Sequence, residues 1–192
     1  QKQIQFLKHK LDFSYGSING LFSPEFGLIE QRQAEQLNFV NLDHILDFLV
    51  ENGIRPLIVF DNQTLKMLKN LNEIQEISII RIFSSARQFI TVTEKILDHV
   101  VNRYGLKEVS NWKFVIWYYV YKQTLMGISG KFVELWDEFF ETVRMRIPNA
   151  CIGGVSYSAS MHRNSAVQFF SEWKIAKHMP DFITINSFPY RE

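Results

Sequence analysis

Four aromatic side chains stand together where an uncharged, apolar stretch of the sequence ends. They are Trp117, Tyr118, Tyr119 and Tyr121, and they close a run that begins at Phe114. Aromatic faces suit the apolar faces of sugar rings, so these side chains could stack on a carbohydrate. Packing at the edge of a core explains the same residues, and both interpretations stay open.

Other side chains that could carry chemistry are few. Asp61 directly follows a predicted strand and could line a pocket, although a loop residue or a helix cap is the simpler interpretation. Cys151 lies in a predicted strand without a histidine close in sequence, which is typical of an inert, buried thiol. The five histidines show no metal-ligand spacing, and no glycine-rich phosphate loop occurs. We therefore expect neither a metal nor a cofactor.

The apolar run that carries the aromatic cluster predicts the central strand of the fold. It spans 114–121, is short, and is rich in β-branched and aromatic residues, as expected of a strand buried on both faces. Amphipathic helices are predicted on either side of it, over 85–104 and 131–146. Parallel α/β proteins place their chemistry at the carboxyl ends of such strands, which is where the aromatic cluster stands.

The rest of the chain repeats this alternation of helix and strand. Helix 39–52 should be capped by Asn38 or Asn41 and closed by Gly53. The segment 61–84 fits a short helix followed by either a strand or a helix. The other predicted elements are helices 1–10 and 166–177, strands 12–19, 55–60, 150–155 and 181–188, and loops 122–130 and 156–160. Regular alternation predicts a parallel sheet with right-handed crossovers, and leaves a barrel and an open sheet both possible in principle.

Composition narrows the class of protein. A length of 192 residues suits one domain or a piece of a larger protein, and the absence of a starting methionine favours the piece. The net charge of +1 excludes a global basic field for nucleic acid. No apolar run is long enough to predict a membrane span. The single cysteine excludes an internal disulfide and fits a reducing compartment, so we expect a cytoplasmic protein.

Five motifs occur in order along the chain, and together they resemble glycoside hydrolase family 39, the family of β-xylosidases and α-L-iduronidases. The third motif, from Arg103-Tyr104-Gly105 to Trp117, is similar to a family pattern that ends in Trp-Asn-Glu-Pro-Asn. The five matching stretches are 18–28, 37–56, 103–117, 148–154 and 181–183. The resemblance implies a (β/α)8 barrel of which this chain supplies five parallel strands, the second to the sixth. The fold class expected is thus α/β, an incomplete TIM-like barrel, with 1–192 as a single family-39-like domain.

The same resemblance implies that the catalytic groups are altered. Glycoside hydrolysis normally needs two carboxyl groups, one acting as the general acid. Tyr119 stands where the family has its catalytic glutamate, and a phenol with an ordinary pKa of about 10 is a poor acid at neutral pH. The family nucleophile belongs to a seventh strand that has no counterpart here. The family's Arg and His on the second strand align with Ser17 and Asn19. Its third-strand Glu aligns with Val59, and its sixth-strand His aligns with Asn186.

Altered pocket residues on a retained scaffold predict a domain that does not catalyse. Family-39-like domains of this kind accompany a helix-turn-helix module in AraC-type transcription regulators. The resemblance therefore implies a ligand-sensing or interaction domain, with DNA bound only by a module outside this chain. The expected partners are a carbohydrate-like ligand and further copies of the chain. The candidate ligand-binding residues are Asn19, Asp61, Trp117, Tyr119, Tyr121 and Asn186.

Two other functions stay open. One is a fragment of an active glycosidase that acts on xylosides with unusual acid and base groups. The other is an assembly module that pairs through the open edges of its sheet.

Overall fold

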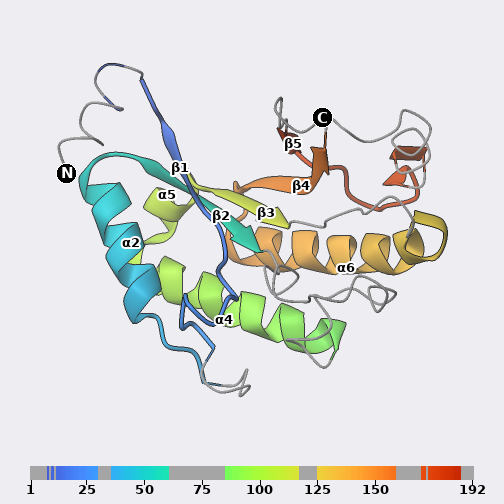
Figure 1. The fold of residues 1–192 in the computed structure, drawn as a ribbon, viewed down its shortest axis with the longest axis horizontal. Coiled ribbons are helices and arrows are strands. Elements are labelled where there is room, and N and C mark those ends of the chain that lie inside the picture. The colour runs from blue at the N-terminus through green and yellow to red at the C-terminus, as the bar shows by residue number, and fades with distance from the viewer. Residues whose placement is uncertain are drawn as a thin grey trace.

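A computed structural model describes residues 8, 10, 12–29, 36–60, 85–116, 125–158, 170–171 and 173–186. Its centre is a five-stranded sheet in which every neighbouring pair is parallel. Spatial order follows sequence order, and the strands curve into about half of a barrel (Figure 1). The strands are β1 (Tyr15–Ile18), β2 (Arg55–Phe60), β3 (Lys113–Ile116), β4 (Cys151–Ser158) and β5 (Phe182–Asn186). The predicted incomplete barrel of five parallel strands is confirmed.

Helices cover one side of this sheet. Those with assigned bounds are α2 (Val40–Glu51), α4 (Ala86–Tyr104), α5 (Leu106–Val109) and α6 (Leu125–Arg146). Figure 1 shows α2, α4 and α6 on the same side of the strands, and no described helix covers the opposite side. We call the helix-covered side the outer face and the other side the inner face.

The outer face forms the core. Four aliphatic and aromatic side chains lie in register across four strands, and each is at most 4% exposed; they are Ile18, Ile58, Phe114 and Ile152. Phe60 extends this layer and meets Phe139 of α6 edge-on, with ring centroids 5.2 Å apart. Burial of large apolar side chains on this face is the main force that holds helices to the sheet.

The ends of α2 explain its bounds. Asn38 accepts a hydrogen bond from the backbone N–H of Val40 at 3.1 Å, whereas Asn41 donates to the carbonyl of Phe26. The N-cap position is Phe39, which has no side-chain cap, so neither predicted cap occupies it; Asn38, one residue earlier, is the one that contacts the first turn. At the other end Gly53 has a φ of +64° and its N–H bonds to Val50, while the next N–H bonds to Leu49. This is the Schellman arrangement, and it confirms the predicted glycine stop.

Helix α4 also matches its prediction. Ser85 has extended backbone geometry, and its hydroxyl accepts a hydrogen bond from the N–H of Gln88 at 3.1 Å. The helix then buries an apolar stripe that includes Phe89, Ile96 and Val100. An N-cap and a stripe of this period are the two signals that a sequence gives most clearly.

Several boundaries differ from the predictions. Strand β1 spans Tyr15–Ile18 rather than 12–19, and Asp12 has a φ of +51°, outside the extended region. Helix α6 begins at Leu125, so the predicted loop 122–130 is wrong over its last six residues. Strand β4 continues to Ser158, so the start of the predicted loop 156–160 is strand, paired with β5 beyond an irregularity near Gly154. The predicted helix 166–177 ends earlier, because Lys174 to His178 form turns and bends.

Several predictions fall outside the residues that the structure describes. These are the segment 61–84, most of helix 1–10, the start of helix 166–177, and residues 117–121 of the central strand.

Candidate functional site

The carboxyl ends of the five strands meet at one edge of the sheet, where parallel α/β folds bind their ligands. At the end of β1, both Ser17 and Asn19 are exposed, and the Asn19 amide donates a hydrogen bond to the Ser17 hydroxyl at 2.9 Å. Gly20 follows with a φ of +74°, a turn that suits glycine and leads the chain into the buried Leu21. The turn holds Ser17 and Asn19 at the carboxyl-end edge of the sheet. The oxygen of the Asn19 side-chain amide can accept a further hydrogen bond there.

The other predicted ligand residues follow the same edge in sequence. Strands β2 and β3 end in register at Phe60 and Ile116. Asn186 is the last residue of β5, and its backbone pairs with Ser158 of β4. The side chain of Asn186, and all of Asp61, Trp117, Tyr119 and Tyr121, lie outside the described part of the chain. Their role as ligand contacts stays a prediction.

The inner face near this edge is apolar where it can be seen. Val59 of β2 is 5% exposed and pairs in register with Val115 of β3, which is 2% exposed. Gly153 continues the row on β4, and the ring of Phe182 lies over it. Over residues 113–116 of β3 and 55–60 of β2, no carboxylate side chain occurs.

A second inner-face feature lies at the opposite ends of the strands. The Lys113 ammonium sits 4.3 Å from the ring centroid of Tyr15 and 5.0 Å from that of Phe182. The guanidinium of Arg55 lies 5.9 Å from the Tyr15 ring. Contacts of this type stabilise a cation against an aromatic face. Local sequence patterns do not predict this group, because only the arrangement of the strands in the sheet brings residues of β1, β3 and β5 together. The one available signal was a lysine at the start of an apolar strand.

Cys151 is the register neighbour of Lys113. Burial raises the pKa of its thiol, and the positive charge of Lys113 opposes that shift without cancelling it. A raised pKa keeps the thiol protonated at neutral pH, in line with the predicted inert cysteine, but the side chain is half-buried rather than buried as predicted.

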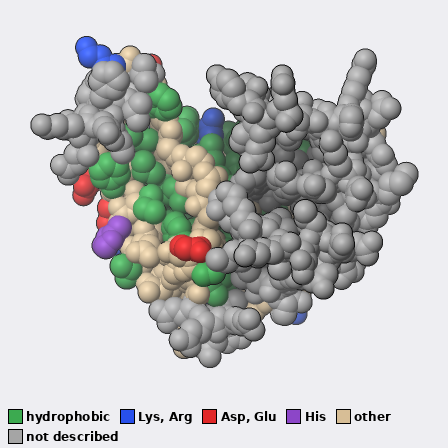
Figure 2. Space-filling view, in the orientation of Figure 1, with side chains coloured by type: hydrophobic (Ala, Val, Ile, Leu, Met, Phe, Trp, Pro, Cys, Tyr) green, Lys and Arg blue, Asp and Glu red, His purple; other side chains and the backbone are tan. Residues whose placement is uncertain are grey.

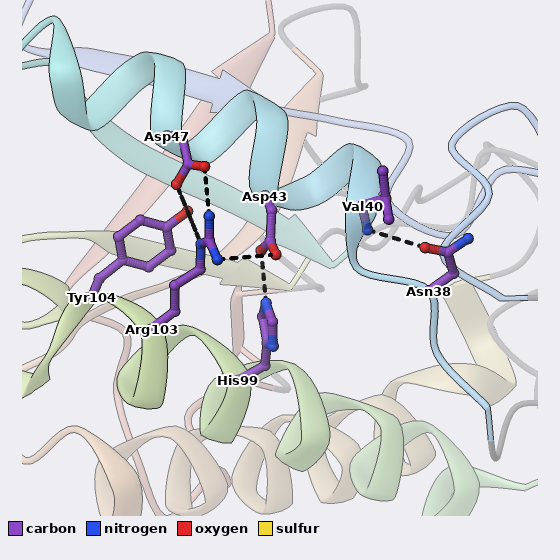
Figure 3. A network of polar contacts seen from close by, with 7 residues as sticks. All are labelled: Asn38, Val40, Asp43, Asp47, His99, Arg103 and Tyr104. Atoms are coloured by element: carbon purple, nitrogen blue, oxygen red, sulfur yellow. Dashed lines mark hydrogen bonds and ion pairs between the residues drawn. The ribbon is translucent and has the colours of Figure 1, made fainter.

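A polar network joins helices α2 and α4 on the outer side of the sheet (Figure 3). Arg103 of α4 contacts Asp47 of α2 at 2.6 Å and Asp43 at 3.6 Å. The Tyr104 hydroxyl donates to Asp47 at 2.7 Å, and His99 meets Asp43 at 2.7 Å. These contacts hold α2 against α4.

This network shifts the titration of its members. Hydrogen bonds from Arg103 and Tyr104 lower the pKa of Asp47. Burial, together with its bond to Asp47, raises the pKa of Tyr104. All of these groups are engaged with one another, so we assign the network a structural role.

The described residues give no sign of a metal site, since they contain no group of three side chains suited to hold an ion. Within the same residues, no helix combines the length and apolar character needed to cross a membrane. On the face drawn in Figure 2, hydrophobic side chains cover much of the coloured surface, and charged side chains are scattered. That pattern lacks the clustered lysine and arginine of a nucleic-acid interface.

A parallel half-barrel with polar side chains at its strand ends belongs to the (β/α)8 class. Residues 1–190 match the sequence model of glycosyl hydrolases family 39, and the chain therefore belongs to that family. The family predicted from the five motifs is confirmed. The association with AraC-type regulators stays a prediction.

Two curated relatives are β-xylosidases. The one from Caldicellulosiruptor saccharolyticus is 25% identical over 120 residues, which is 61% of this chain and 25% of the relative. The one from Geobacillus stearothermophilus is 24% identical over 128 residues, or 59% of this chain and 24% of the relative. The chain thus spans about a quarter of the length of these relatives.

Solved structures show the same fold. A family 39 β-xylosidase from Caulobacter crescentus aligns with a TM-score of 0.70 at 18% identity, covering 96% of this chain and 42% of that protein. A family 39 enzyme from Xanthomonas axonopodis pv. citri aligns with a TM-score of 0.68 at 16% identity, covering 96% and 37%. At such identities the likeness concerns the fold alone.

Proposed function

We propose that this chain forms the ligand-binding part of a glycosidase-type barrel, and that its ligand is a xyloside-like carbohydrate. Membership of family 39 over residues 1–190 carries this proposal, supported by two relatives that are both β-xylosidases. The exposed pair of Ser17 and Asn19 at the strand-end edge supplies hydroxyl and amide groups of the kind that bind sugar hydroxyls.

Cleavage of a glycosidic bond sets a further requirement. It normally needs two carboxyl groups flanking the scissile bond. The described inner-face positions nearest the strand ends include Ser17, Val59 and Val115, none of which is acidic. We therefore propose that the 192-residue chain does not hydrolyse glycosides alone, and that a glycosidase built on it draws carboxylates from further polypeptide.

The test compares the 192-residue chain with the complete gene product. Aryl β-xylosides serve as substrates, and xylose as the ligand in thermal unfolding. We expect turnover by the complete product and none by the chain. Saturating xylose should raise the melting temperature of the chain, because a ligand at 100 times its Kd adds about 2.7 kcal/mol of stability. Turnover by the chain alone would contradict the proposal, as would the absence of any shift with xylose or its oligomers.

Asn19→Ala refines the binding test. Removal of the amide should abolish or reduce the shift with xylose while leaving the unliganded melting temperature almost unchanged, because Asn19 is exposed. The matched control is Asn111→Ala, an exposed asparagine that precedes the start of β3 and so lies at the opposite end of the strands from Asn19.

A second function has its own support. Tyr119 stands where the resembling family motif has its glutamate, which favours a non-catalytic sensor such as the ligand domain of an AraC-type transcription regulator. Such a domain is expected in the cytoplasm, with DNA bound by a separate module and self-association as its output. Saturable binding of a sugar by the complete gene product, without turnover of any xyloside, would favour this function over the first.

A further inference from the structure

A set of contacts on the inner face joins the two outermost strands of the sheet through one lysine. The Lys113 ammonium, on the middle strand β3, lies 4.3 Å from the ring centroid of Tyr15 on β1 and 5.0 Å from that of Phe182 on β5. Both distances fall within the range in which the face of an aromatic ring attracts a cation. We call Tyr15, Lys113 and Phe182 the inner-face bridge.

The bridge brings the two edges of the sheet closer together than a flat sheet would. Neighbouring strands lie about 4.8 Å apart, so β1 and β5 would be about 19 Å apart in a flat sheet of five strands. Because both rings contact the same ammonium nitrogen, their centroids are at most about 9.3 Å apart. The two edges therefore lean toward the inner face, which agrees with the curvature of the strands in Figure 1.

The strand between Lys113 and Phe182 leaves room for this contact. Gly153 of β4 pairs in register with Phe182, and a methyl group at Gly153 would lie 2.5 Å from the Phe182 ring. The ring thus lies over the backbone of β4, where a side chain would otherwise stand. Tyr15 and Phe182 are two residues to either side of the register row that contains Lys113. The bridge therefore crosses the sheet diagonally, a direction that long and aromatic side chains can span.

The strands that the bridge joins lead to two of the candidate ligand residues. Asn19 directly follows β1, and Asn186 is the last residue of β5. Each stands four residues beyond the bridge aromatic of its strand, which is about 13 Å at 3.3 Å per residue. At that distance Lys113 does not touch a sugar bound at the strand ends. Its influence on such a sugar passes through the separation of the two strands.

We propose that Lys113 is a positioning residue of the carbohydrate site: its contacts with Tyr15 and Phe182 fix the separation of β1 and β5, and so the separation of the polar groups at their carboxyl ends. This inference rests on the proposed function. A neutral side chain of similar length would fill the same space without attracting either ring. The charge of Lys113, rather than its length, is therefore the property to test.

A distance measurement between two spin labels tests the bridge itself, without any ligand. The labels are attached through Ser14→Cys, an exposed position just before β1, and Ile183→Cys, a position 43% exposed on β5. Cys151→Ala removes the one native cysteine, so only these two sites are labelled. We expect a narrow distance distribution in this background. Adding Lys113→Met should broaden it and lengthen its mean, whereas Lys113→Arg keeps a cation and should leave it narrow.

Two further variants complete the distance test. Lys107→Met on α5 is the matched control, since it also removes a lysine charge, from an exposed site off the sheet. Phe182→Leu removes one ring of the bridge; it should broaden the distribution as Lys113→Met does, and it decides the question if Lys113→Met does not fold. An unchanged distribution in a folded Lys113→Met variant would overturn the proposal. Equal broadening in Lys113→Arg would also overturn it, because packing rather than charge would then hold the strands.

Xylose binding tests whether the bridge acts on the site. Calorimetric titration of the 192-residue chain should give a Kd about 2- to 30-fold higher for Lys113→Met, the range for residues that act on a site without contact. Lys113→Arg should restore the wild-type Kd, and Lys107→Met should not change it. Equal affinity of wild type and Lys113→Met would overturn the positioning role.

The two measurements distinguish failure of this inference from failure of the proposed function. If the wild type binds neither xylose nor its oligomers, the carbohydrate function is wrong and the positioning role falls with it. The label distances still decide, in that case, whether the charge of Lys113 joins β1 to β5. If the wild type binds xylose and Lys113→Met changes neither the distances nor the Kd, the carbohydrate function stands and the inference about Lys113 is wrong.

Discussion

The two faces of the sheet differ in how far they are completed by the chain itself. On the outer face, the register row from Ile18 to Ile152 is at most 4% exposed, and the helices supply its second layer. On the inner face, the equivalent row from Ser17 through Leu57 and Lys113 to Cys151 has exposed or half-buried members throughout. Along this row each strand thus has a buried outer side and an incompletely covered inner side, whereas nearer the carboxyl ends the inner side is also buried, at Val59 and Val115.

This difference indicates a division of roles. The outer face contributes most of the apolar burial and so most of the folding free energy. The inner face holds the strand-end polar pair and Lys113 between its two rings, and no described helix packs on it. Sites that bind other molecules are expected where the chain leaves its surface incomplete, since a completed face has no surface left to offer.

The largest expected effect is a difference in the free energy of unfolding between alanine variants of two neighbouring residues on β2. Ile58 points to the outer face and is fully buried, whereas Leu57 points to the inner face and is half-buried. Ile58→Ala should lower the free energy of unfolding by about 2–5 kcal/mol, the range for a fully buried aliphatic side chain. Leu57→Ala should have a clearly smaller effect. Urea unfolding of both variants measures the difference, and equal losses would mean that the inner face is as tightly packed as the outer.

A smaller difference in stability is expected between alanine variants of the two adjacent glycines of β4, Gly153 and Gly154. A methyl group at Gly154 would lie 2.4 Å from a ring carbon of Trp173 and 3.1 Å from one of Trp136, both of them buried. Overpacking of that kind costs about 1–3 kcal/mol. A methyl group at Gly153 would meet only the ring of Phe182, at 2.5 Å, and that ring is half-buried on an edge strand.

We therefore expect Gly154→Ala to lower the melting temperature more than Gly153→Ala does. Scanning calorimetry of both variants measures the difference. Gly153→Ala should also displace the Phe182 ring from Lys113, an effect that tryptic protection or acylation of Lys113 would report. A larger loss for Gly153→Ala would place the rigid packing on the inner face and reverse the comparison.

The sequence predicted the outer half of the molecule well, because local signals define it. Strand β2 matches its predicted bounds, since an apolar run stands between Gly53 and Asp61. Helix α4 matches because its cap and stripe are both local. The start of α6 was missed because Gly127 and Gly130 are typical of loops. A glycine lowers helix stability by only about 1 kcal/mol, so a helix anchored further along by Trp136 and Phe139 can include them.

The inner face was harder to predict, because its groups assemble through register. The polar end of β4 was taken for a loop on composition, but its backbone pairs with β5 and so forms a strand. The contact of Lys113 with Tyr15 and Phe182 joins residues far apart in sequence. Of the candidate site, Asn19 was correctly expected at a strand end, because the alternation before it and Gly20 after it are local signals. Its role as a ligand contact stays a prediction.

The smallest expected effect concerns the polar network between α2 and α4, which contributes electrostatics to an outer face otherwise held by apolar packing. The pKa of Asp47 is lowered in the folded state by hydrogen bonds from Arg103 and Tyr104. A carboxyl with a depressed folded pKa adds stability above its unfolded pKa, about 3.9, and loses that contribution as the pH falls through the folded value. Asp47→Asn should thus be slightly less stable than the wild type at pH 7, and the two should converge below a pH of about 4.

Solvent screening keeps this difference small, because Arg103 is exposed and Asp47 is only half-buried, and added salt should reduce it further. Urea unfolding across pH 3–7 measures it, with Glu138→Gln on α6 as the control, since Glu138 has no ion pair within the described structure. If the difference in unfolding free energy between wild type and Asp47→Asn grew as the pH fell, the pKa of Asp47 would be raised, not lowered, by folding. It would mean that the contacts between α2 and α4 do not favour the ionised carboxylate, and that apolar packing alone holds these two helices together.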